Sequence, residues 1–410
     1  MKCRHCNTPL EFTFADLGTA PPSNAYLKSD DLENAEKYYP LKIMVCSHCW
    51  LVQTEDFVGA DELFSKEYAY FSSFSVSWLE HARNYVETMT RRLPLSDHSM
   101  VVEIAANDGY LLQYVKEKNI PCYGIEPTRS TAEAARKKGI AIIERFFGTK
   151  LADELARAGK QADLIAANNV LAHVPDINDF VKGFSILLKH GGVATFEFPH
   201  LYNLVKQNQF DTIYHEHYSY LSLTVVHTIF EANGLAIFDV EKLPTHGGSL
   251  RVYAQRSDAG CQPASSSVNA LLKQENLAGM RSKKFYQGFQ KKAEKTRDDL
   301  VSFLTDAKRK GKTAAGYGAA AKGNTLMNFA GIKPDLVSYI VDRNPSKQGK
   351  YMPGSHIPIK AEQCFRQDKP DYILILPWNL QYEVRKQLAY TRQWNCRFVT
   401  AIPELHISSV

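Results

Sequence analysis

The stretch that decides the fold is Val101-Val102-Glu103-Ile104-Ala105-Ala106-Asn107-Asp108-Gly109-Tyr110-Leu111-Leu112. A hydrophobic run leads into a polar turn that carries a glycine, and apolar residues at helical spacing follow it. This order predicts a strand, a sharp turn and a helix, and such a turn places a ligand at the helix N-terminus. A second strand is predicted at 121–125, and Glu126 closes it. Because an acidic residue at this position usually binds a ribose diol, the pattern predicts a nucleotide-like ligand.

The composition is that of a soluble protein with more than one domain. A chain of 410 residues is too long for one ordinary core. Its formal net charge of +5 favours neither a nucleic-acid partner nor a membrane surface, although it suits an anionic small substrate. No apolar run approaches the roughly 18 residues of a membrane helix, and the N-terminus lacks the apolar stretch of a signal peptide. We therefore expect a cytoplasmic protein, and the sequence is compatible with a monomer.

Four of the eight cysteines form two C-x-x-C pairs: Cys3, Cys6, Cys46 and Cys49. In a cytoplasmic chain these thiols are reduced, and two such pairs predict a zinc site of four thiolates. Four thiolates leave no open coordination position, so the expected zinc is structural. The alternative is two disulfides, which a reducing compartment disfavours.

From about residue 98 the chain alternates strand and helix patterns. Strands are predicted at 100–104, 122–125, 141–143, 164–167 and 193–198, with helices between them such as 131–138 and 177–188. This alternation predicts a doubly wound parallel sheet, in which ligands lie at the carboxyl ends of the strands. The preceding residues 58–97 are predicted to be helical, and their segment 67–75, rich in aromatic and hydroxyl groups, forms either a cavity lid or a packed surface.

A second α/β unit follows a charged helical connector at about 268–310. Residues 313–325 carry the pattern of a strand, a glycine turn and a helix start, and further strands are predicted at 336–341 and 372–376. The backbone amides of such a turn suit a pyrophosphate. Either both glycine turns bind a ligand, or the second one only repeats the architecture.

One polar segment carries candidate acid–base groups: Tyr214-His215-Glu216-His217. Its histidines would not share a helix face, so it is not the H-E-x-x-H zinc motif. An imidazole titrates near neutral pH and a tyrosine hydroxyl can stabilise an oxyanion, so the segment is either an acid–base site or a packed polar segment. His173 follows the fourth strand, and His246, beside Gly247 and Gly248, could line the same cavity. No G-x-S-x-G, Walker A or kinase signature is present, which argues against hydrolase and phosphotransfer chemistry.

The motifs occur in one order along nearly the whole chain. They are the two cysteine pairs, the Glu-Ile-Ala-x-Asn-Asp-Gly turn (103–109), the Tyr-His-Glu-His segment (214–217), the His-Gly-Gly-Ser-Leu-Arg turn (246–251) and the late Gly-Tyr-Gly-Ala-Ala-Ala-Lys-Gly turn (316–323). Together they resemble the S-adenosylmethionine-dependent sugar C-methyltransferases that act on nucleotide-linked 4-keto-deoxysugars. The resemblance implies an α/β chain of three parts. These are a small zinc-binding domain at 1–57, a doubly wound class I methyltransferase domain with lead-in helices at 58–265, and a helical connector with a C-terminal Rossmann-like domain at 266–410.

The resemblance also implies the ligand contacts. The S-adenosylmethionine site would comprise Glu103, Ala105, Asn107, Gly109, Tyr110, Glu126, Phe146 and Asn168. Within it, Glu126 would bind the ribose hydroxyls, Phe146 and Phe147 would flank the adenine, and Ala105 stands where the family's first glycine is expected. The nucleotide sugar would contact His246, Gly247, Gly248, Lys322 and Asn344.

For the chemistry, the resemblance implies methylation at C3 of the sugar, because the 4-keto group acidifies the C3 proton. The implied catalytic residues are His217, Glu216, Tyr214, His173 and either Tyr68 or Tyr70. His217, positioned by Glu216, would remove the proton. Tyr214 and His173 would stabilise the resulting enediolate, and a tyrosine before the core, Tyr68 or Tyr70, would line the site.

Three other functions are compatible with parts of the pattern. A methyltransferase acting on another small molecule or on RNA is the first, but the modest charge and the lack of a basic-aromatic strip disfavour RNA. An NAD-dependent sugar-nucleotide oxidoreductase would use the late glycine turn and would need hydride chemistry. A scaffold without catalysis would not need tyrosine, histidine and glutamate concentrated at the predicted strand ends.

Overall fold

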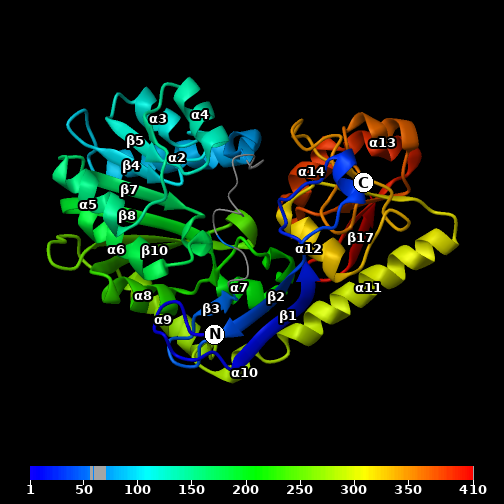
Figure 1. The fold of residues 1–410 in the computed structure, drawn as a ribbon, viewed down its shortest axis with the longest axis horizontal. Helices are drawn as coiled ribbons and strands as arrows, with labels where there is room; N and C mark the ends of the chain where they lie inside the picture. Colours follow the sequence, from blue (N-terminus) through cyan, green and yellow to red (C-terminus); the bar gives the residue numbers. More distant parts are fainter. Residues whose placement is uncertain (56–58, 60–70, 410) are drawn as a thin grey trace.

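The computed structural model describes residues 1–55, 59 and 71–409, and they form three connected units (Figure 1). A central lobe and a C-terminal lobe, each built on its own sheet, lie side by side, and the N-terminal sheet lies against both of them. The predicted fold class is confirmed: a small cysteine-bearing N-terminal unit, a doubly wound α/β unit and a second Rossmann-like unit. In the described part of the chain, no helix is long and apolar enough to cross a membrane.

In the described residues, the N-terminal sheet has four antiparallel strands in the order β1-β2-β3-β9. Their bounds are β1 (Phe12–Ala20), β2 (Tyr39–Val45), β3 (Val52–Thr54) and β9 (Ser219–Tyr220). The last strand comes from the central lobe, directly after the predicted acid–base segment. The sheet packs on the connector helices, where the rings of Phe14 and Phe289 stack 4.3 Å apart. The N-terminal unit is therefore built partly from the segment that carries the candidate catalytic groups.

The central sheet has seven strands in the order β10-β11-β8-β7-β4-β5-β6. The parallel strands are β4 (Val101–Ile104), β5 (Cys122–Ile125), β6 (Ile142–Ile143), β7 (Ala162–Asn168) and β8 (Leu188–Pro199). The sheet continues with β11 (Ser249–Arg256) and β10 (Leu235–Leu243), which are antiparallel. The antiparallel edge departs from the wholly parallel sheet of the prediction. The link between β10 and β11 is too short for a crossover, so these strands must form a hairpin.

Helices cover both faces of this sheet because its strands alternate between two cores. Leu164 and Ala166 of β7 join the core under α2, whereas Ile165 and Ala167 join the core under α6. The helices of this lobe are α2 (Val76–Arg92), α3 (Leu112–Glu117), α4 (Arg129–Lys137), α5 (Thr149–Arg157), α6 (Ile177–Leu187), α7 (Leu201–Lys206) and α8 (Leu223–Ala232). This double cover leaves the carboxyl ends of the strands as the natural ligand edge.

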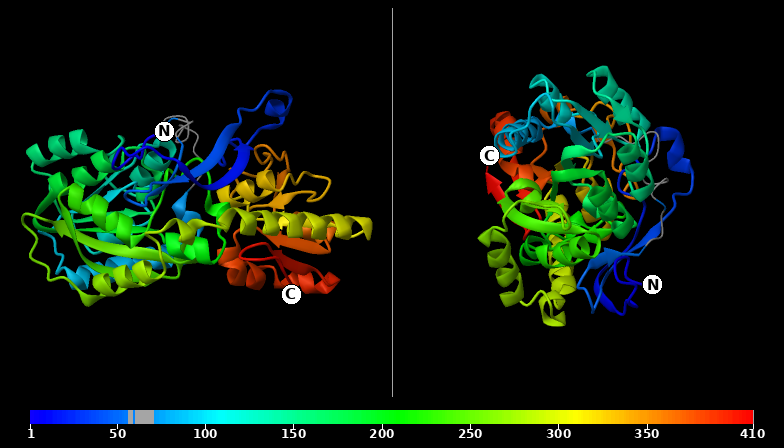
Figure 2. Two further views of the ribbon diagram at one scale, coloured as in Figure 1. Left: turned by 90° about the horizontal axis from the view of Figure 1, so that it is seen from below. Right: turned by 90° about the vertical axis from the view of Figure 1, so that its left-hand side faces the viewer.

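The connector and the C-terminal lobe follow the predicted pattern. The connector contains α9 (Ser266–Leu277), α10 (Lys283–Tyr286) and the long α11 (Phe289–Arg309), which runs beside the C-terminal lobe (Figure 2). The second sheet has the order β14-β13-β12-β15-β16-β17, with only β17 antiparallel. Its strands are β12 (Ala314–Tyr317), β13 (Ile340–Val341), β14 (Ile359–Lys360), β15 (Tyr372–Ile375), β16 (Arg397–Thr400) and β17 (His406–Ser409), and its helices are α12 (Ala321–Phe329), α13 (Gln363–Asp368) and α14 (Gln381–Gln387). The strand predicted at 336–341 is shortened to two residues, because Leu336 and Val337 turn back to bond Lys333.

A loop of the N-terminal unit holds the C-terminal lobe in place. Leu27 and Tyr351 exchange backbone hydrogen bonds of 3.0 and 2.9 Å. The Tyr26 hydroxyl donates to the carbonyl oxygen of Ala319, at the second glycine turn, over 2.6 Å. The same loop also reaches the polar segment of the central lobe, because Asn24 donates to the Glu216 carboxylate, so one N-terminal loop contacts both of the other units.

Candidate active site

The four predicted cysteine ligands lie together. All four sulfur atoms lie within 4.8 Å of one another, and the Sγ atoms of Cys6 and Cys46 are 3.5 Å apart. A tetrahedron with Zn–S bonds of about 2.3 Å has edges of about 3.8 Å, so the cluster has the size of a zinc–thiolate site. Gln53 donates from Nε2 to the Cys3 sulfur over 3.3 Å, as a supporting group beyond the ligands does. The donor set therefore fits a structural zinc ion.

The first glycine turn has the backbone conformation that its sequence predicts. Ala105, Asn107 and Gly109 have φ angles of +58°, +49° and +75°. A Cβ atom on Gly109 would lie 2.4 Å from Ile140 Cδ1, so only glycine fits where the turn packs on its neighbours. Ala105 takes the left-handed conformation without the freedom of glycine, and its small side chain keeps the turn open to a ligand.

Two polar side chains at adjacent strand ends are buried with little polar contact. Both carboxylate oxygens of Glu103 and both amide atoms of Asn168 lack a well-formed hydrogen bond within the described part of the chain, and the Tyr110 hydroxyl interacts only weakly with both side chains. Burial raises the pKa of Glu103 well above its ordinary value, an effect that Tyr110 opposes only in part. Unpaired buried polar groups are costly. They are explained if a ligand with a cationic donor, such as the ammonium of a methionine moiety, fills this site.

Glu126, which is predicted to bind the ribose, follows the second strand and holds two backbone amides. Its Oε2 accepts from the backbone amide of Asn107 and its Oε1 from that of Thr128, each over 2.9 Å. Each oxygen keeps acceptor capacity for a hydroxyl group. Phe146 is 50% exposed and available to cover a base. Its neighbour Phe147, the other predicted adenine contact, packs in the core beside the rings of α6.

The predicted catalytic histidines form one cluster. His217 Nδ1 lies 2.8 Å from the carbonyl oxygen of Thr212, and its Nε2 lies 2.7 Å from the Tyr214 hydroxyl. Because a carbonyl only accepts, Nδ1 carries the proton and Nε2 is the basic atom, which accepts from Tyr214. The His173 ring lies edge-on to that of His217, with centroids 4.6 Å apart. Burial lowers the pKa of His217 well below its ordinary value and that of His173 to about 4, so both imidazoles are neutral at neutral pH.

Glu216 contributes to this cluster through its backbone. Its carbonyl oxygen accepts from His173 Nδ1 over 2.7 Å, whereas its carboxylate accepts from Asn24 Nδ2 over 3.0 Å. The expected orientation of His217 by the Glu216 carboxylate is replaced by the carbonyl of Thr212, since that carboxylate faces the N-terminal loop. Tyr68 and Tyr70, the two candidate tyrosines before the core, lie outside the described residues.

The turn at 246–248 lies on the same edge of the sheet. His246, with φ +53°, accepts at Nε2 from Asn169 Nδ2 over 3.1 Å. Burial lowers the pKa of His246 to about 4, and the nearby charge of Lys322 adds to this effect. Gly247 and Gly248 also have positive φ, and a Cβ atom on Gly247 would lie 2.5 Å from Trp378 of the C-terminal lobe. This turn is therefore packed directly against the second lobe.

Lys322, the predicted substrate contact of the second lobe, faces the central lobe. Its Nζ donates to Asn379 Oδ1 over 2.7 Å and lies 4.8 Å from the ring centroid of Trp378. Trp378 Nε1 in turn donates to buried Asp211 over 2.7 Å. Burial lowers the pKa of Lys322, and the Asp211 carboxylate opposes that shift. A cation from the second lobe thus lies near the histidine cluster of the first.

Asn344 lies in the loop after β13, two residues beyond the acidic residue Asp342 that follows this strand. Its Oδ1 accepts from the amide and the hydroxyl of Ser346, over 3.0 and 2.8 Å. The preceding Asp342 accepts from the amides of Ala319 and Asn344, each over 2.8 Å. Asp342 therefore bridges its own loop and the second glycine turn, as Glu126 does at the first. The two lobes repeat the same local design.

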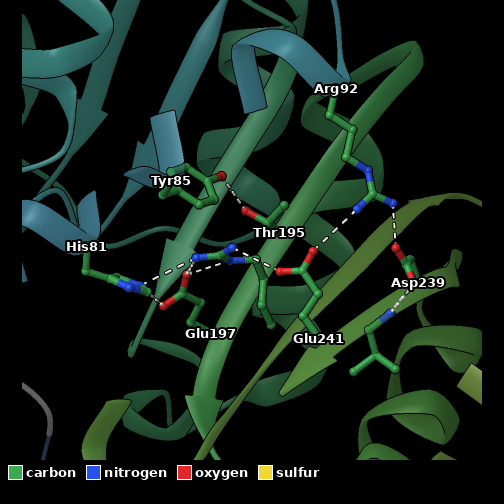
Figure 3. A network of polar contacts seen from close by, with 9 residues as sticks. His81, Tyr85, Arg92, Thr195, Glu197, Asp239 and Glu241 are labelled. Atoms are coloured by element: carbon green, nitrogen blue, oxygen red, sulfur yellow. Dashed lines mark hydrogen bonds and ion pairs between the residues drawn. The ribbon is translucent and has the colours of Figure 1, made fainter. Parts of the chain in front are cut away.

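A network that sequence reasoning missed supports the carboxyl end of the central sheet (Figure 3). Glu197 of β8 accepts from His81 Nε2 over 2.8 Å and from Arg251 Nε over 2.7 Å. Burial alone would raise the pKa of Glu197, but the hydrogen bond from His81 and the charge of Arg251 lower it. The His81 ring stacks on the ring of Trp78. The Trp78 ring also stacks on that of Tyr110, which follows the first glycine turn, with ring centroids 5.8 Å apart. Arg251 is the last residue of the His-Gly-Gly-Ser-Leu-Arg motif (246–251), so this motif was the sequence signal that could have pointed to the network.

Comparisons with known protein families divide the chain in the same order. A family model described as a zinc binding domain matches residues 3–64. One described as a methyltransferase domain matches residues 78–240. One described as a C-methyltransferase C-terminal domain matches residues 244–403.

The chain is also similar to individual proteins. C-methyltransferase NovU of Streptomyces niveus is 33% identical over 410 residues, a match that covers 100% of this chain and 97% of that protein. Among solved structures, magnesium protoporphyrin IX methyltransferase of Synechocystis PCC 6803 with bound SAH has a TM-score of 0.35 and 15% identity, and the match covers 44% of this chain and 83% of that one. An S-adenosylmethionine-dependent methyltransferase of Clostridium acetobutylicum has a TM-score of 0.36 and 13% identity, covering 43% of this chain and 92% of that one.

Proposed function

The chain belongs to the C-methyltransferase family, and we propose that it methylates C3 of a nucleotide-linked 4-keto-deoxysugar. It is an S-adenosylmethionine-dependent enzyme with a structural zinc site. The observation that carries the substrate proposal is the cluster of Tyr214, His173 and His217 at the ligand edge of the sheet.

A C-methyltransferase needs a carbon nucleophile. When bound, S-adenosylmethionine supplies an electrophilic sulfonium methyl group. A substrate carbon can accept this methyl group only if that carbon has an electron pair available for the new bond. A carbon beside a ketone gains that pair by losing an acidified proton to a base. This requirement supports a keto substrate, because the site offers both a basic imidazole nitrogen for the proton and a tyrosine hydroxyl for the oxyanion.

In the proposed reaction His217 takes the proton at Nε2, with Nδ1–H held on the Thr212 carbonyl. Tyr214 stabilises the oxygen of the enediolate, and the positive charge of Lys322 favours the same species. The predicted role of His173 in holding that oxygen does not fit its protonation, because its Nδ1–H donates to the Glu216 carbonyl and its Nε2 can only accept a proton or a hydrogen bond. The new C–C bond forms as the S–CH3 bond breaks, and the sulfur keeps the bonding pair. Glu103 and Asn168 would hold the methionine moiety and Glu126 the ribose.

The nucleotide part of the substrate is supported by the second lobe. The helix α12 begins directly after the second glycine turn, and the backbone amides of such a turn suit a diphosphate. Lys322 is the second residue of α12. Gly247, next to His246, packs against Trp378 of the second lobe, so a ligand between the lobes would meet both the 246–248 turn and that lobe. Asn344 would complete the contacts from the loop after Asp342.

A substrate panel tests this proposal. The purified protein is incubated with S-adenosylmethionine and 4-keto-deoxysugars carried on dTDP or GDP, and products are analysed by mass spectrometry. We expect one added methyl group on a 4-keto compound and none on the corresponding 4-hydroxy compound. His217→Asn, which keeps a side-chain amide donor for the Thr212 carbonyl, should abolish transfer and retain S-adenosylmethionine binding. Equal methylation of 4-keto and 4-hydroxy sugars would contradict the carbanion chemistry.

A further inference from the structure

We propose that Arg4 and Thr54 are positioning residues that connect the zinc site to the two histidines, His173 and His217. The inference rests on the proposed function, because it assumes that these imidazoles do the proton chemistry. It extends that function by giving the zinc-binding unit a part in catalysis beyond its own folding.

Arg4 lies inside the first cysteine pair and reaches both histidine-bearing segments. Its guanidinium donates from one terminal nitrogen to the carbonyl of Pro175 over 2.8 Å, and from the other to the carbonyl of Thr54 over 3.0 Å. Pro175 lies two residues after His173, which ends the 3-10 helix η3 (Leu171–His173). The same guanidinium lies 5.2 Å from the ring centroid of Tyr218, directly after His217. One side chain of the first cysteine pair (residues 3–6, here called the zinc knuckle) thus fixes the backbone near each of the two imidazoles.

Thr54 makes the second connection. Its hydroxyl donates to the carbonyl of His217 over 3.2 Å, and its amide donates to the carbonyl of Tyr218 over 3.1 Å. Thr54 ends β3, whose residues Val52 and Gln53 pair with β9. The backbone of His217 is therefore bound to the edge of the zinc-binding sheet.

Gln53 links this edge to the metal ligands. Besides donating to the Cys3 sulfur, its side chain accepts from the Arg4 amide at Oε1 over 2.9 Å. Gln53 is fully buried, so these bonds lie in a water-excluded place and hold a fixed geometry. Movement of the knuckle on loss of zinc would displace Arg4 and β3 together.

The consequence for catalysis follows from the geometry of the pair. His173 donates to the carbonyl of Glu216, and the backbone carbonyl of His217 is held by the hydroxyl of Thr54. Their relative position therefore depends on contacts that meet at the zinc knuckle. A displacement of about 1 Å at a reacting group can reduce rate on the order of 100-fold. Substrate and cofactor affinity need not change, because those contacts lie on other elements.

Arg4→Gln in the full-length, zinc-loaded protein tests the proposal. We expect kcat to fall on the order of 10-fold or more, with unchanged zinc content and an unchanged Kd for S-adenosylmethionine in a direct titration. We also expect a larger primary isotope effect when the reacting carbon of the 4-keto sugar carries deuterium, because a displaced base slows proton removal. Arg4→Lys, which can reach one of the two carbonyls, should give an intermediate kcat.

Gln290→Ala is the matched control. Gln290 also makes two side-chain bonds to the N-terminal sheet, at the amide and the carbonyl of Asp16, but it stands on α11, far along the chain from the histidines. It should leave kcat and the isotope effect unchanged. If Arg4→Gln does not fold, Thr54→Val provides a second test, since it keeps the shape and removes the hydroxyl bond to His217. The proposal is overturned if Arg4→Gln, or Thr54→Val in its place, retains the kcat and isotope effect of the control.

His217→Asn separates this proposal from the proposed function. If His217→Asn keeps full turnover, the base assignment fails and with it the premise. If His217→Asn is inactive while Arg4→Gln is fully active, the proposed function stands and the positioning role alone is wrong.

Discussion

Replacing His173 with Asn tests the electrostatic state of the histidine cluster through stability. Burial lowers the pKa of His173 to about 4, whereas an unfolded chain has the ordinary value of about 6.5. Between pH about 4 and about 6.5, His173 is therefore protonated in the unfolded state and neutral in the folded state. The resulting stability is present above pH about 6.5 and is lost as the pH falls toward 4. Asn keeps an N–H donor for the carbonyl of Glu216 and does not titrate.

The size of the effect follows from the two pKa values. The difference between the two pKa values of one such histidine corresponds to about 3 kcal/mol in the free energy of unfolding. About 2 kcal/mol of this contribution is lost between about pH 7.5 and pH 5. His246, whose pKa burial also lowers to about 4, adds a term of the same sign. Asp211 has the opposite sign, because burial raises its pKa to about 6 and so favours the folded state as the pH falls. The comparison of wild type with the variant isolates the His173 term.

The assay is urea unfolding followed by circular dichroism at the two pH values. We expect the stability advantage of the wild type over His173→Asn to shrink by about 2 kcal/mol between about pH 7.5 and pH 5. A difference between the two proteins that does not depend on pH would refute the reasoning, since it would mean that His173 titrates equally in both states.

Three further variants test other parts of the account. Cys46→Ser should reduce bound zinc below one equivalent and lower the melting temperature, and an unchanged metal content would contradict the four-thiolate site. Arg251→Met should destabilise the fold by about 3 to 5 kcal/mol, because it leaves Glu197 buried with a reduced set of partners, and urea unfolding would measure this. Glu126→Gln should raise the Kd for S-adenosylmethionine by about 10-fold in a calorimetric titration, since a neutral amide is a weaker partner for the ribose hydroxyls, and an unchanged Kd would remove Glu126 from the ribose site.

The fold was largely predictable because its signals are local. Alternating strand and helix patterns with glycine turns specify a doubly wound sheet, and the polar groups that close its strands meet at one edge. Glu126 was predicted from this pattern and the family resemblance added Glu103 and Asn168, and all three stand at ends of neighbouring strands. The antiparallel hairpin at the sheet edge was less visible, because strand direction depends on the length of the link rather than on composition.

The rest of the site depends on contacts that leave no mark in one sequence. The ring of His217 is oriented by the carbonyl of Thr212, and every residue has a carbonyl. The Glu216 carboxylate faces Asn24, far away in the chain, although its sequence position next to His217 suggested a direct role. The two-residue strand β9 is too short to give a period-2 pattern, so its membership of the zinc-binding sheet could not be predicted.

In the proposed reaction a neutral imidazole generates a carbanion beside a ketone, and the carbanion then takes the methyl group. NMR of the product made from S-adenosylmethionine labelled with 13C in its methyl group and a 4-keto sugar deuterated at C3 tests this step. We expect a 13C methyl group bonded to C3, with the C3 deuterium lost, and no such product from His217→Asn. A label on oxygen or nitrogen, or a product that keeps the deuterium at C3, would contradict it.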